Sequence, residues 1–295
     1  MIKNTPLTLA KQPILFVINP NAGTDRRKEG FKDLIHKYLD TNSFDPHIVF
    51  TERAKHATEL TKTYYQQGIR EFVAIGGDGT INEIGKELVN TEANLSLISK
   101  GSGNGLARHL NLYENEIEGI KKIPARKPHK IDVGLLNKTI FLCTAGVGFD
   151  ALCAHRFSEI PGGRGLKAYV RTAFGSYRSF KSIKLLNGQE VFSLTFGNAA
   201  QFGNNAFVTP LAEIDDGLLD CSLVKPHPWY AVAKLGQQLF TKKIDQSVYV
   251  EYQRAKSFEF DFEEPQLIHI DGEALQQKEK HIEVNIIEKA LSIRI

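Results

Sequence analysis

Short apolar runs alternate with segments of helical periodicity over residues 13–110. Residues 14–18 predict a strand, and the next apolar positions recur at the spacing of one helix face: Phe31, Leu34, Ile35, Tyr38 and Leu39. Further short strands are expected at 47–50, 72–75 and 95–98. Strand, helix and strand in succession indicate βαβ crossovers and therefore a parallel sheet.

After Lys130 the pattern changes to two-residue alternation with two tight hairpins, at 135–140 and 185–189. Residues 123–128, rich in Pro and Lys, favour neither helix nor strand and mark a boundary. We predict an α/β domain over 1–130, for which the C-terminal strand 290–295 is a candidate to complete the sheet, and an antiparallel β domain over 131–289. Later strands are expected at 218–224, 248–252, 257–262, 267–270, 282–287 and 291–295.

Composition is that of a globular protein of about two domains, with 295 residues, 42% hydrophobic and 24% charged. The three cysteines form no C-x-x-C pair, which indicates neither a disulfide framework nor a zinc site. No secretion signal is found at the N-terminus. The longest uncharged stretch, 191–212, holds Asn, Gln and Pro, which argues against a membrane span. We expect a cytoplasmic protein, at most peripheral at the inner membrane surface.

Three loops of small residues follow predicted strands, at 19–23, 76–80 and 101–105. Glycines at the end of a strand let backbone N–H groups approach a phosphate, and a following helix adds a favourable dipole. The simpler alternative is that Thr80-x-x-Glu83 is only a capping box over a shaped turn. Because ligands bind at the carboxyl edge of an open α/β sheet, the three loops together predict one phosphate-binding cleft.

These loops resemble those of the diacylglycerol kinase catalytic domain family, which includes bacterial soluble lipid kinases and sphingosine kinases. The Gly-Gly-Asp-Gly motif is shared with NAD kinases, whereas the ordered set is specific. One departure is Ser99-Lys100, where the family usually has a proline. The motifs that carry the resemblance span nearly the whole chain: Asn19-Pro20-Asn21-Ala22-Gly23, Gly76-Gly77-Asp78-Gly79-Thr80, Gly101-Ser102-Gly103-Asn104, and residues 131–134, 146–151, 215–217 and 271–273.

The resemblance implies a Rossmann-like parallel sheet, as in NAD kinases and diacylglycerol kinases, followed by an antiparallel β-sandwich domain. It also implies ATP-dependent phosphorylation of a lipid hydroxyl, such as that of diacylglycerol, sphingosine or a ceramide-like lipid, with Mg²⁺. Two alternatives stay open. The Gly-Gly-Asp-Gly motif also suits an NAD kinase, and the Ser99-Lys100 departure suits a catalytically inactive nucleotide- or lipid-binding protein.

By position in the motifs, the resemblance assigns Asp78 to the phosphates and magnesium, as a catalytic residue. It assigns the proton acceptor to Glu273, with Asp271 the close alternative; two apart in an extended segment, these carboxylates share a side. The residues alone favour a plain Asp-Gly turn there. The residues expected to bind ATP are Asn19, Pro20, Asn21, Ala22, Gly23, Thr51, Gly77, Asp78, Gly79, Thr80, Ile81, Asn82, Glu83 and Ser102.

Two further expectations come from the resemblance. Asp215, Asp216 and Leu218 would hold a structural Mg²⁺, although the residues alone are equally consistent with an Asx turn. Asp150 would contact the lipid head group, or else serve only as a helix N-cap.

Charge is unevenly distributed along the chain, with a net +6 over 130–189 and −6 over 190–295. A helix predicted over about 163–182 places basic residues on one arc beside an apolar stripe. Such a helix suits an anionic membrane surface, although a solvated face over a buried stripe is the simpler alternative. No nucleic-acid reading module is present, and a homodimer remains open. The basic residues of the arc are Arg164, Lys167, Arg171, Arg178 and Lys181.

Overall fold

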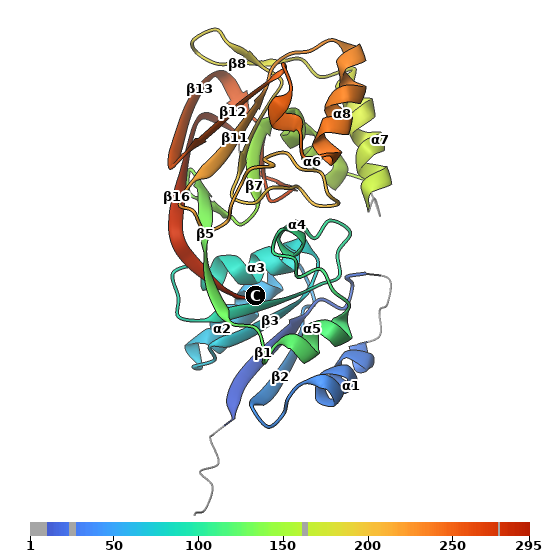
Figure 1. The fold of residues 1–295 in the computed structure, drawn as a ribbon, viewed down its shortest axis with the longest axis vertical. Helices are drawn as coiled ribbons and strands as arrows, with labels where there is room; N and C mark the ends of the chain where they lie inside the picture. Colours follow the sequence, from blue (N-terminus) through green and yellow to red (C-terminus); the bar gives the residue numbers. More distant parts are fainter. Residues whose placement is uncertain (1–10, 24–27, 161–164, 277) are drawn as a thin grey trace, which may run out of the picture.

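The computed structural model of the chain describes residues 11–23, 28–160, 165–276 and 278–295. Two lobes follow one another along the long axis of the molecule, an N-terminal lobe at the bottom of Figure 1 and a C-terminal lobe at the top. No helix in the described part of the chain is long and apolar enough to cross a bilayer.

The N-terminal lobe alternates strands and helices as the sequence pattern predicts. Its elements are β1 (Gln12–Ile18), α1 (Lys28–Tyr38), β2 (Phe44–Phe50), α2 (His56–Gln66), β3 (Glu71–Gly76), α3 (Asp78–Leu88), β4 (Asn94–Ser99), α4 (Gly105–His109) and α5 (Glu116–Lys122). The first four strands form a parallel sheet in the order β2-β1-β3-β4. Helices α1 and α5 pack on one face and α2 and α3 on the other, which explains why the central strands are apolar runs without alternation.

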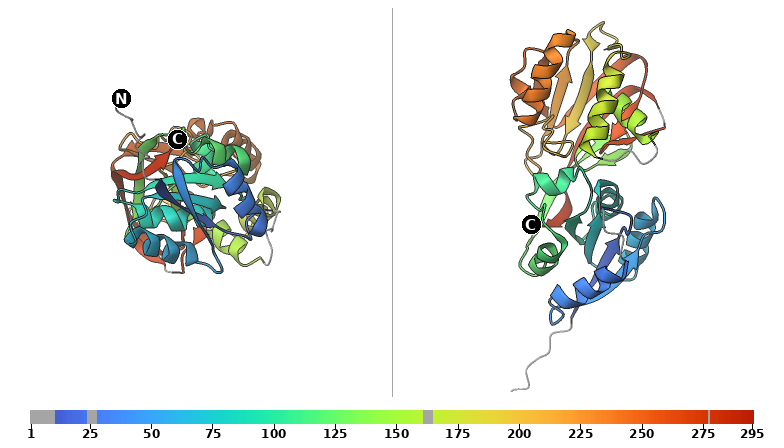
Figure 2. Two further views of the ribbon diagram at one scale, coloured as in Figure 1. Left: turned by 90° about the horizontal axis from the view of Figure 1, so that it is seen from below. Right: turned by 90° about the vertical axis from the view of Figure 1, so that its right-hand side faces the viewer.

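The C-terminal lobe is a sandwich. Its elements are β5 (Pro128–Leu136), β6 (Thr139–Phe141), β7 (Thr144–Gly148), α6 (Phe149–Ser158), α7 (Leu166–Tyr177), β8 (Ile183–Lys184), β9 (Glu190–Val191), β10 (Ser193–Gly197), β11 (Leu219–Val224), η1 (Trp229–Ala231), α8 (Val232–Phe240), η2 (Ile244–Gln246), β12 (Val250–Ala255), β13 (Ser257–Gln266), β14 (Ile268–Ile270), β15 (Glu273–Ala274) and β16 (Glu279–Arg294). An antiparallel sheet in the order β12-β11-β10-β7-β14-β15 packs one face against β5, β6, β13 and β16. Helices α6, α7 and α8 lie on its other face (Figure 2).

Two long strands, β5 and β16, run between the lobes. Ser292 and Ile293 pair with β4 in parallel, so the end of the chain extends the N-terminal sheet. The separate strands expected at 282–287 and 291–295 are one strand, β16, with a register shift between Ile287 and Leu291. Lys289 lies in this bulge with φ of 51°, and its N–H donates to Asp132 Oδ1. The apparent break in the apolar pattern is therefore a bulge.

The predicted helix over 163–182 is shorter in the structure, because α7 ends at Tyr177. Arg164 lies outside the described residues, and Lys181 follows the helix. The two predicted hairpins are confirmed: β5 and β6 pair around residues 137–138, and β8 and β9 pair around 185–189.

Candidate functional site

A single cavity of about 1620 Å³ connects the two lobes. At the N-terminal lobe it is lined by all three glycine-rich loops, including Gly23, Gly77 and Ser102. At the C-terminal lobe it is lined by apolar side chains of α6, α7, η1 and α8. Between the two ends lie Asp150, His269, Asp271 and Glu273. One cavity therefore joins a polar, glycine-rich end to an apolar end across a group of carboxylates.

The glycine loops approach each other so closely that side chains would not fit. A Cβ on Gly101 would lie 2.9 Å from the Cα of Gly77, so the two loops meet backbone to backbone. The first loop is tied to the same point, because the Asn19 amide donates to Thr80 Oγ1 at 3.2 Å. This packing leaves backbone N–H groups at the carboxyl edge of the sheet, where an anion can be held.

Asp78 begins α3 and fastens the second glycine loop to the first turn of that helix. One carboxylate oxygen accepts the Asn104 N–H and the other accepts the Gly105 N–H, each at 2.8 Å. Burial raises the pKa of Asp78, and the two backbone hydrogen bonds act in the opposite direction. Asp78 therefore positions the loop that contains Ser102.

The cavity wall includes nine of the residues expected to bind ATP: Asn19, Asn21, Ala22, Gly23, Gly77, Asp78, Gly79, Thr80 and Ser102. Pro20, Thr51, Ile81, Asn82 and Glu83 do not line it. Glu83 instead caps α2, since its two oxygens accept the N–H groups of Lys55 and Ala57. The Thr80-x-x-Glu83 capping box is therefore not formed, because α3 begins at Asp78 after Gly77 without a side-chain cap and Glu83 caps the neighbouring helix.

Asp271 is enclosed by hydrogen-bond donors. Its carboxylate accepts the N–H groups of Leu142, Cys143 and Thr144 at 2.7–3.2 Å and pairs with Lys86 Nζ at 3.3 Å. Only 2% of its side chain is exposed. The residue has a φ of 54°, as the Asp-Gly turn between β14 and β15 requires. Asp271 is a buried anchor between the lobes.

Glu273, two residues later, stays open to the cavity. Its Oε1 lies 2.9 Å from the position that a Cβ on Gly79 would occupy, so the carboxylate sits directly against the Gly-Gly-Asp-Gly loop. Its surroundings raise its pKa, mainly by desolvation, while Lys86 acts in the opposite direction. A carboxylate with a raised pKa beside a phosphate-binding loop suits a general base.

Asp150 belongs to a buried polar group on the cavity wall. Its Oδ2 accepts the Thr195 hydroxyl at 2.6 Å and lies 3.1 Å from His269 Nε2, while Oδ1 accepts its own helix N–H at Ala151. The other ring nitrogen of His269 is buried without a hydrogen-bond partner in the described part of the chain. The expected N-cap role is wrong, because α6 begins at Phe149 after Gly148 and Asp150 lies within its first turn. Asp150 does line the cavity, as contact with a head group requires.

The turn at 215–217 does not fit a bound divalent cation. Asp215 turns toward His129 Nε2 at 2.8 Å, whereas Asp216 pairs with Arg254 and accepts the Leu218 N–H. The two carboxylates thus diverge, and a guanidinium already neutralises one of them. The Asp215 and Asp216 carboxylates therefore do not converge on one point, as ligands of a single divalent cation would.

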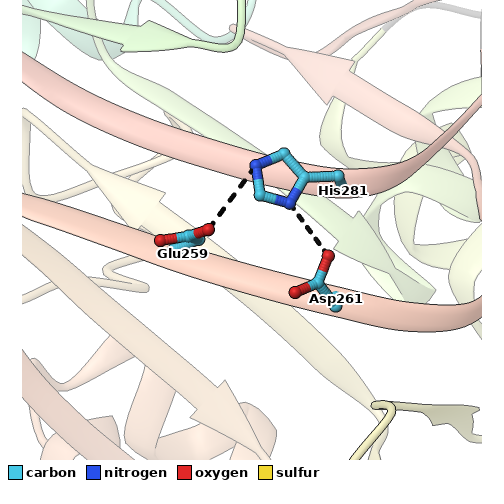
Figure 3. Close-up of side chains that lie close together, drawn as sticks. All are labelled: Glu259, Asp261 and His281. Carbon is cyan, nitrogen blue, oxygen red and sulfur yellow. Dashed lines mark hydrogen bonds and ion pairs between the residues drawn. The ribbon is translucent and has the colours of Figure 1, made fainter.

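Within the described residues, one group of three side chains could hold a metal ion, on the exposed ribbon of β13 and β16 (Figure 3). His281 Nδ1 lies 2.9 Å from Asp261, but Nε2 lies 3.8 Å from Glu259. The two carboxylates face different ring nitrogens, so a metal bound at one nitrogen would have only one of them beside it. The hydrogen bond to Asp261 raises the pKa of His281, as expected for a surface ion-pair group.

Several contacts of the site were not identified from the sequence. Lys100 Nζ pairs with Glu116 at 2.6 Å and lies 4.4 Å from the Phe31 ring centre, so the lysine of the Ser99-Lys100 departure contacts α1 and α5 at the base of the loop. The sequence did not identify Lys86 or Arg254, because their ion pairs with Asp271 and Asp216 join residues far apart in the chain. His269 lies in β14, and its contact with Asp150 also depends on residues far apart in the sequence.

Comparisons with known proteins agree with this architecture. Residues 13–136 match the diacylglycerol kinase catalytic domain, and residues 144–293 match the YegS C-terminal NAD kinase β-sandwich-like domain. The chain therefore belongs to the diacylglycerol kinase catalytic domain family, in the branch with a YegS-type C-terminal domain. Membership of this family makes it an enzyme of the kinase class.

Similar proteins span most of the chain. A protein of Chromohalobacter salexigens named "Probable lipid kinase YegS-like" is 28% identical over 226 residues, 72% of this chain and 73% of its own. One of the same name from Pseudomonas fluorescens is 28% identical over 262 residues, 85% of this chain and 81% of its own.

Solved structures share the fold. A diacylglycerol kinase from Bacillus anthracis superposes with a TM-score of 0.73 at 20% identity, over 97% of both chains. A yeast NADH kinase complexed with NADH gives a TM-score of 0.52 at 12% identity, over 96% of this chain and 83% of its own. Both confirm the expected fold class, an α/β domain followed by an antiparallel β-sandwich.

Proposed function

We propose that the chain is an ATP-dependent lipid kinase that transfers the γ-phosphate to a lipid hydroxyl, with diacylglycerol, sphingosine and ceramide-like lipids as candidate acceptors. One observation carries the proposal: the glycine-rich loops, Glu273 and a long apolar wall line the same cavity. Residues 1–130 with 290–295 would then form the nucleotide-binding part, and 131–289 the lipid-binding part.

The apolar end of the cavity suits a hydrocarbon chain. Its walls are mainly aliphatic and aromatic side chains from the helices that cover the C-terminal sheet. Asp150, held by Thr195 and His269, is a carboxylate on the C-terminal part of the wall and would accept a hydrogen bond from an acceptor head group. The apolar residues include Phe157, Tyr169, Val170, Ala173, Phe174, Val208, Val232, Leu235 and Leu239.

The nucleotide would bind at the polar end, with its phosphates against the backbone N–H groups of the loops at Gly23, Gly77 and Ser102. Mg²⁺ would enter with the nucleotide and neutralise phosphate charge. Asp78 and Glu273 are the carboxylates of this wall that could contact it. Gly77, Gly79 and Gly101 keep the wall free of side chains there.

Glu273 would remove the proton from the acceptor hydroxyl. The hydroxyl oxygen then bonds to the γ-phosphorus as the bond to the β–γ bridging oxygen breaks, and ADP leaves with that oxygen. Asp271 cannot easily take this role, because its carboxylate is already surrounded by three backbone N–H groups and Lys86. Its part is to fix the turn that presents Glu273.

Labelled ATP with a panel of lipid hydroxyls and NAD tests the proposal. Transfer to at least one lipid and not to NAD is expected, and Asp78→Asn and Glu273→Gln should each lower it by about 100-fold or more without unfolding the protein. Transfer to NAD alone would make the chain an NAD kinase. Binding of ATP without transfer to any acceptor would make it an inactive binding protein, and either result would overturn the proposal.

A further inference from the structure

Large apolar side chains are exposed where the cavity opens between α7 and the η1–α8 segment. Val170 and Phe174 on α7 are 49% and 67% exposed, and Trp229 and Phe240 on the other side are 79% and 44% exposed. All four also line the cavity. Tyr230, 67% exposed, stands next to Trp229. We call α7 and residues 229–243 the mouth face; the right-hand view of Figure 2 shows both helices on one side of the molecule.

The mouth face carries only positive charge. Residues 166–181 and 226–244 contain no Asp or Glu. Arg171 and Arg178 lie three positions before and four after Phe174, so they flank it on the helix surface. Six exposed cations gather here, and none forms an ion pair within the described residues: Arg171, Arg178, Lys181, Lys234, Lys242 and Lys243.

Some exposed cations elsewhere on the C-terminal lobe have acidic partners, whereas others, such as Lys138 and Lys280, form no ion pair within the described residues. Lys225 pairs with Glu251 and Lys256 with Glu288, at 2.7 and 2.6 Å. The mouth differs from the rest of the lobe because its two segments contain no acidic residue and its cations lie beside exposed aromatic rings, so it suits a partner that carries negative charge. A second copy of the chain joined by a two-fold axis would oppose the same cations to each other, which is unfavourable. An anionic surface with an apolar interior complements both the cations and the exposed rings.

We propose that the mouth face docks on an anionic phospholipid bilayer, with Trp229, Tyr230 and Phe174 in the interfacial layer. This proposal rests on the lipid kinase function above. Aromatic rings favour the boundary between head groups and hydrocarbon, and cations near the surface attract anionic lipids. Docked in this way, the cavity opens onto the membrane, and an acceptor lipid reaches Glu273 without passing through water. The η1–α8 segment is as much a part of this surface as α7.

Trp229 is the one tryptophan of the chain, so its fluorescence reports directly on the mouth face. Vesicles containing phosphatidylglycerol should shift its emission to the blue, and brominated lipids should quench it. Vesicles of phosphatidylcholine alone should do so much more weakly, and added salt should reverse the shift. No shift with anionic vesicles would overturn the proposal. A blue shift without lipid that grows with protein concentration would show a second copy on this face and overturn it too.

Variants separate docking from catalysis, because Tyr230, Arg171, Lys234 and Lys243 do not line the cavity. The triple variant Arg171→Ala, Lys234→Ala, Lys243→Ala should weaken vesicle binding roughly fivefold per cation removed, the ratio for about 1 kcal/mol each. Tyr230→Ala should weaken it further. The matched control, Lys32→Ala with Lys37→Ala and Lys62→Ala, removes three exposed cations of the N-terminal lobe and should leave binding unchanged. Equal loss in the control would contradict a specific docking face.

Activity on two forms of acceptor distinguishes the two proposals. The triple variant should lose activity on vesicle-borne diacylglycerol but keep it on a short-chain diacylglycerol dispersed in detergent. Vesicle binding by a wild-type protein that phosphorylates no lipid would support docking and overturn the kinase proposal. Activity on the dispersed lipid by a protein that does not bind anionic vesicles would do the reverse.

Discussion

Neutralising the two carboxylates of the Asp-Gly-Glu turn should have different effects: the Asp271 variant should lose stability and the Glu273 variant should lose activity. In Asp271→Asn, an amide replaces the oxygen Oδ2, which pairs with Lys86 at 3.3 Å and accepts the Leu142 N–H at 3.1 Å. The variant also turns the remaining charge-assisted bonds from the N–H groups of Cys143 and Thr144 into neutral ones. Losing this buried ion pair and placing an NH₂ against an N–H donor should cost about 3 kcal/mol of unfolding free energy.

Glu273→Gln should do the opposite. Its carboxylate is open to the cavity, and desolvation already disfavours its charged form, so the variant should change the unfolding free energy by no more than about 0.5 kcal/mol. Activity should fall by roughly 10²–10⁴-fold because the proton acceptor is lost.

Urea denaturation and the labelled-ATP assay on the same preparations provide both readouts. The assignment of roles would be refuted if Asp271→Asn were as stable as wild type yet inactive, with Glu273→Gln still active. That result would make Asp271 the base.

Three further predictions concern the cations around the site. Lys86→Met removes a charge that lowers the pKa of Glu273. Because Glu273 must be ionised to accept a proton, the acid limb of the kcat–pH profile should move to higher pH. The control Lys62→Met should leave this limb in place. Because Arg254 neutralises Asp216, EDTA should not lower the Tm of the wild-type protein in scanning fluorimetry, and a fall of several degrees would contradict this role of Arg254. Arg254→Ala should lower the free energy of unfolding by about 2 kcal/mol in urea denaturation. Lys100→Ala should raise KM for ATP more than it lowers kcat in initial-rate assays, with Lys100→Arg partly restoring it; an unchanged KM would contradict its positioning role.

Local pattern was enough to predict the N-terminal sheet. Strands such as β3 are short apolar runs followed by glycine, and the helices show one apolar stripe each, so period and turn signals agree. The local pattern wrongly predicted two strands where β16 is one, because a bulge at Lys289 interrupts the apolar pattern without ending the strand. A bulge depends on the partner strand, which a local pattern does not contain.

The glycine loops and the position of Glu273 were likewise accessible from motifs, because each motif is contiguous. The contacts of Asp271 and Asp216 were not, since they depend on backbone N–H groups and an arginine far away in sequence. The apolar stripe predicted for this helix is present on α7. Its surroundings could not be predicted, because only the fold shows that Val170 and Phe174 line an open cavity instead of a closed core.

The most direct test of the central claim is the transfer of labelled phosphate from ATP to a lipid hydroxyl by the purified wild-type protein, with NAD in the same panel. We expect label in at least one lipid and none in NAD, and with Glu273→Gln we expect lipid labelling to be weaker by about 100-fold or more. Label in NAD and in no lipid, or full lipid labelling by Glu273→Gln, would contradict it.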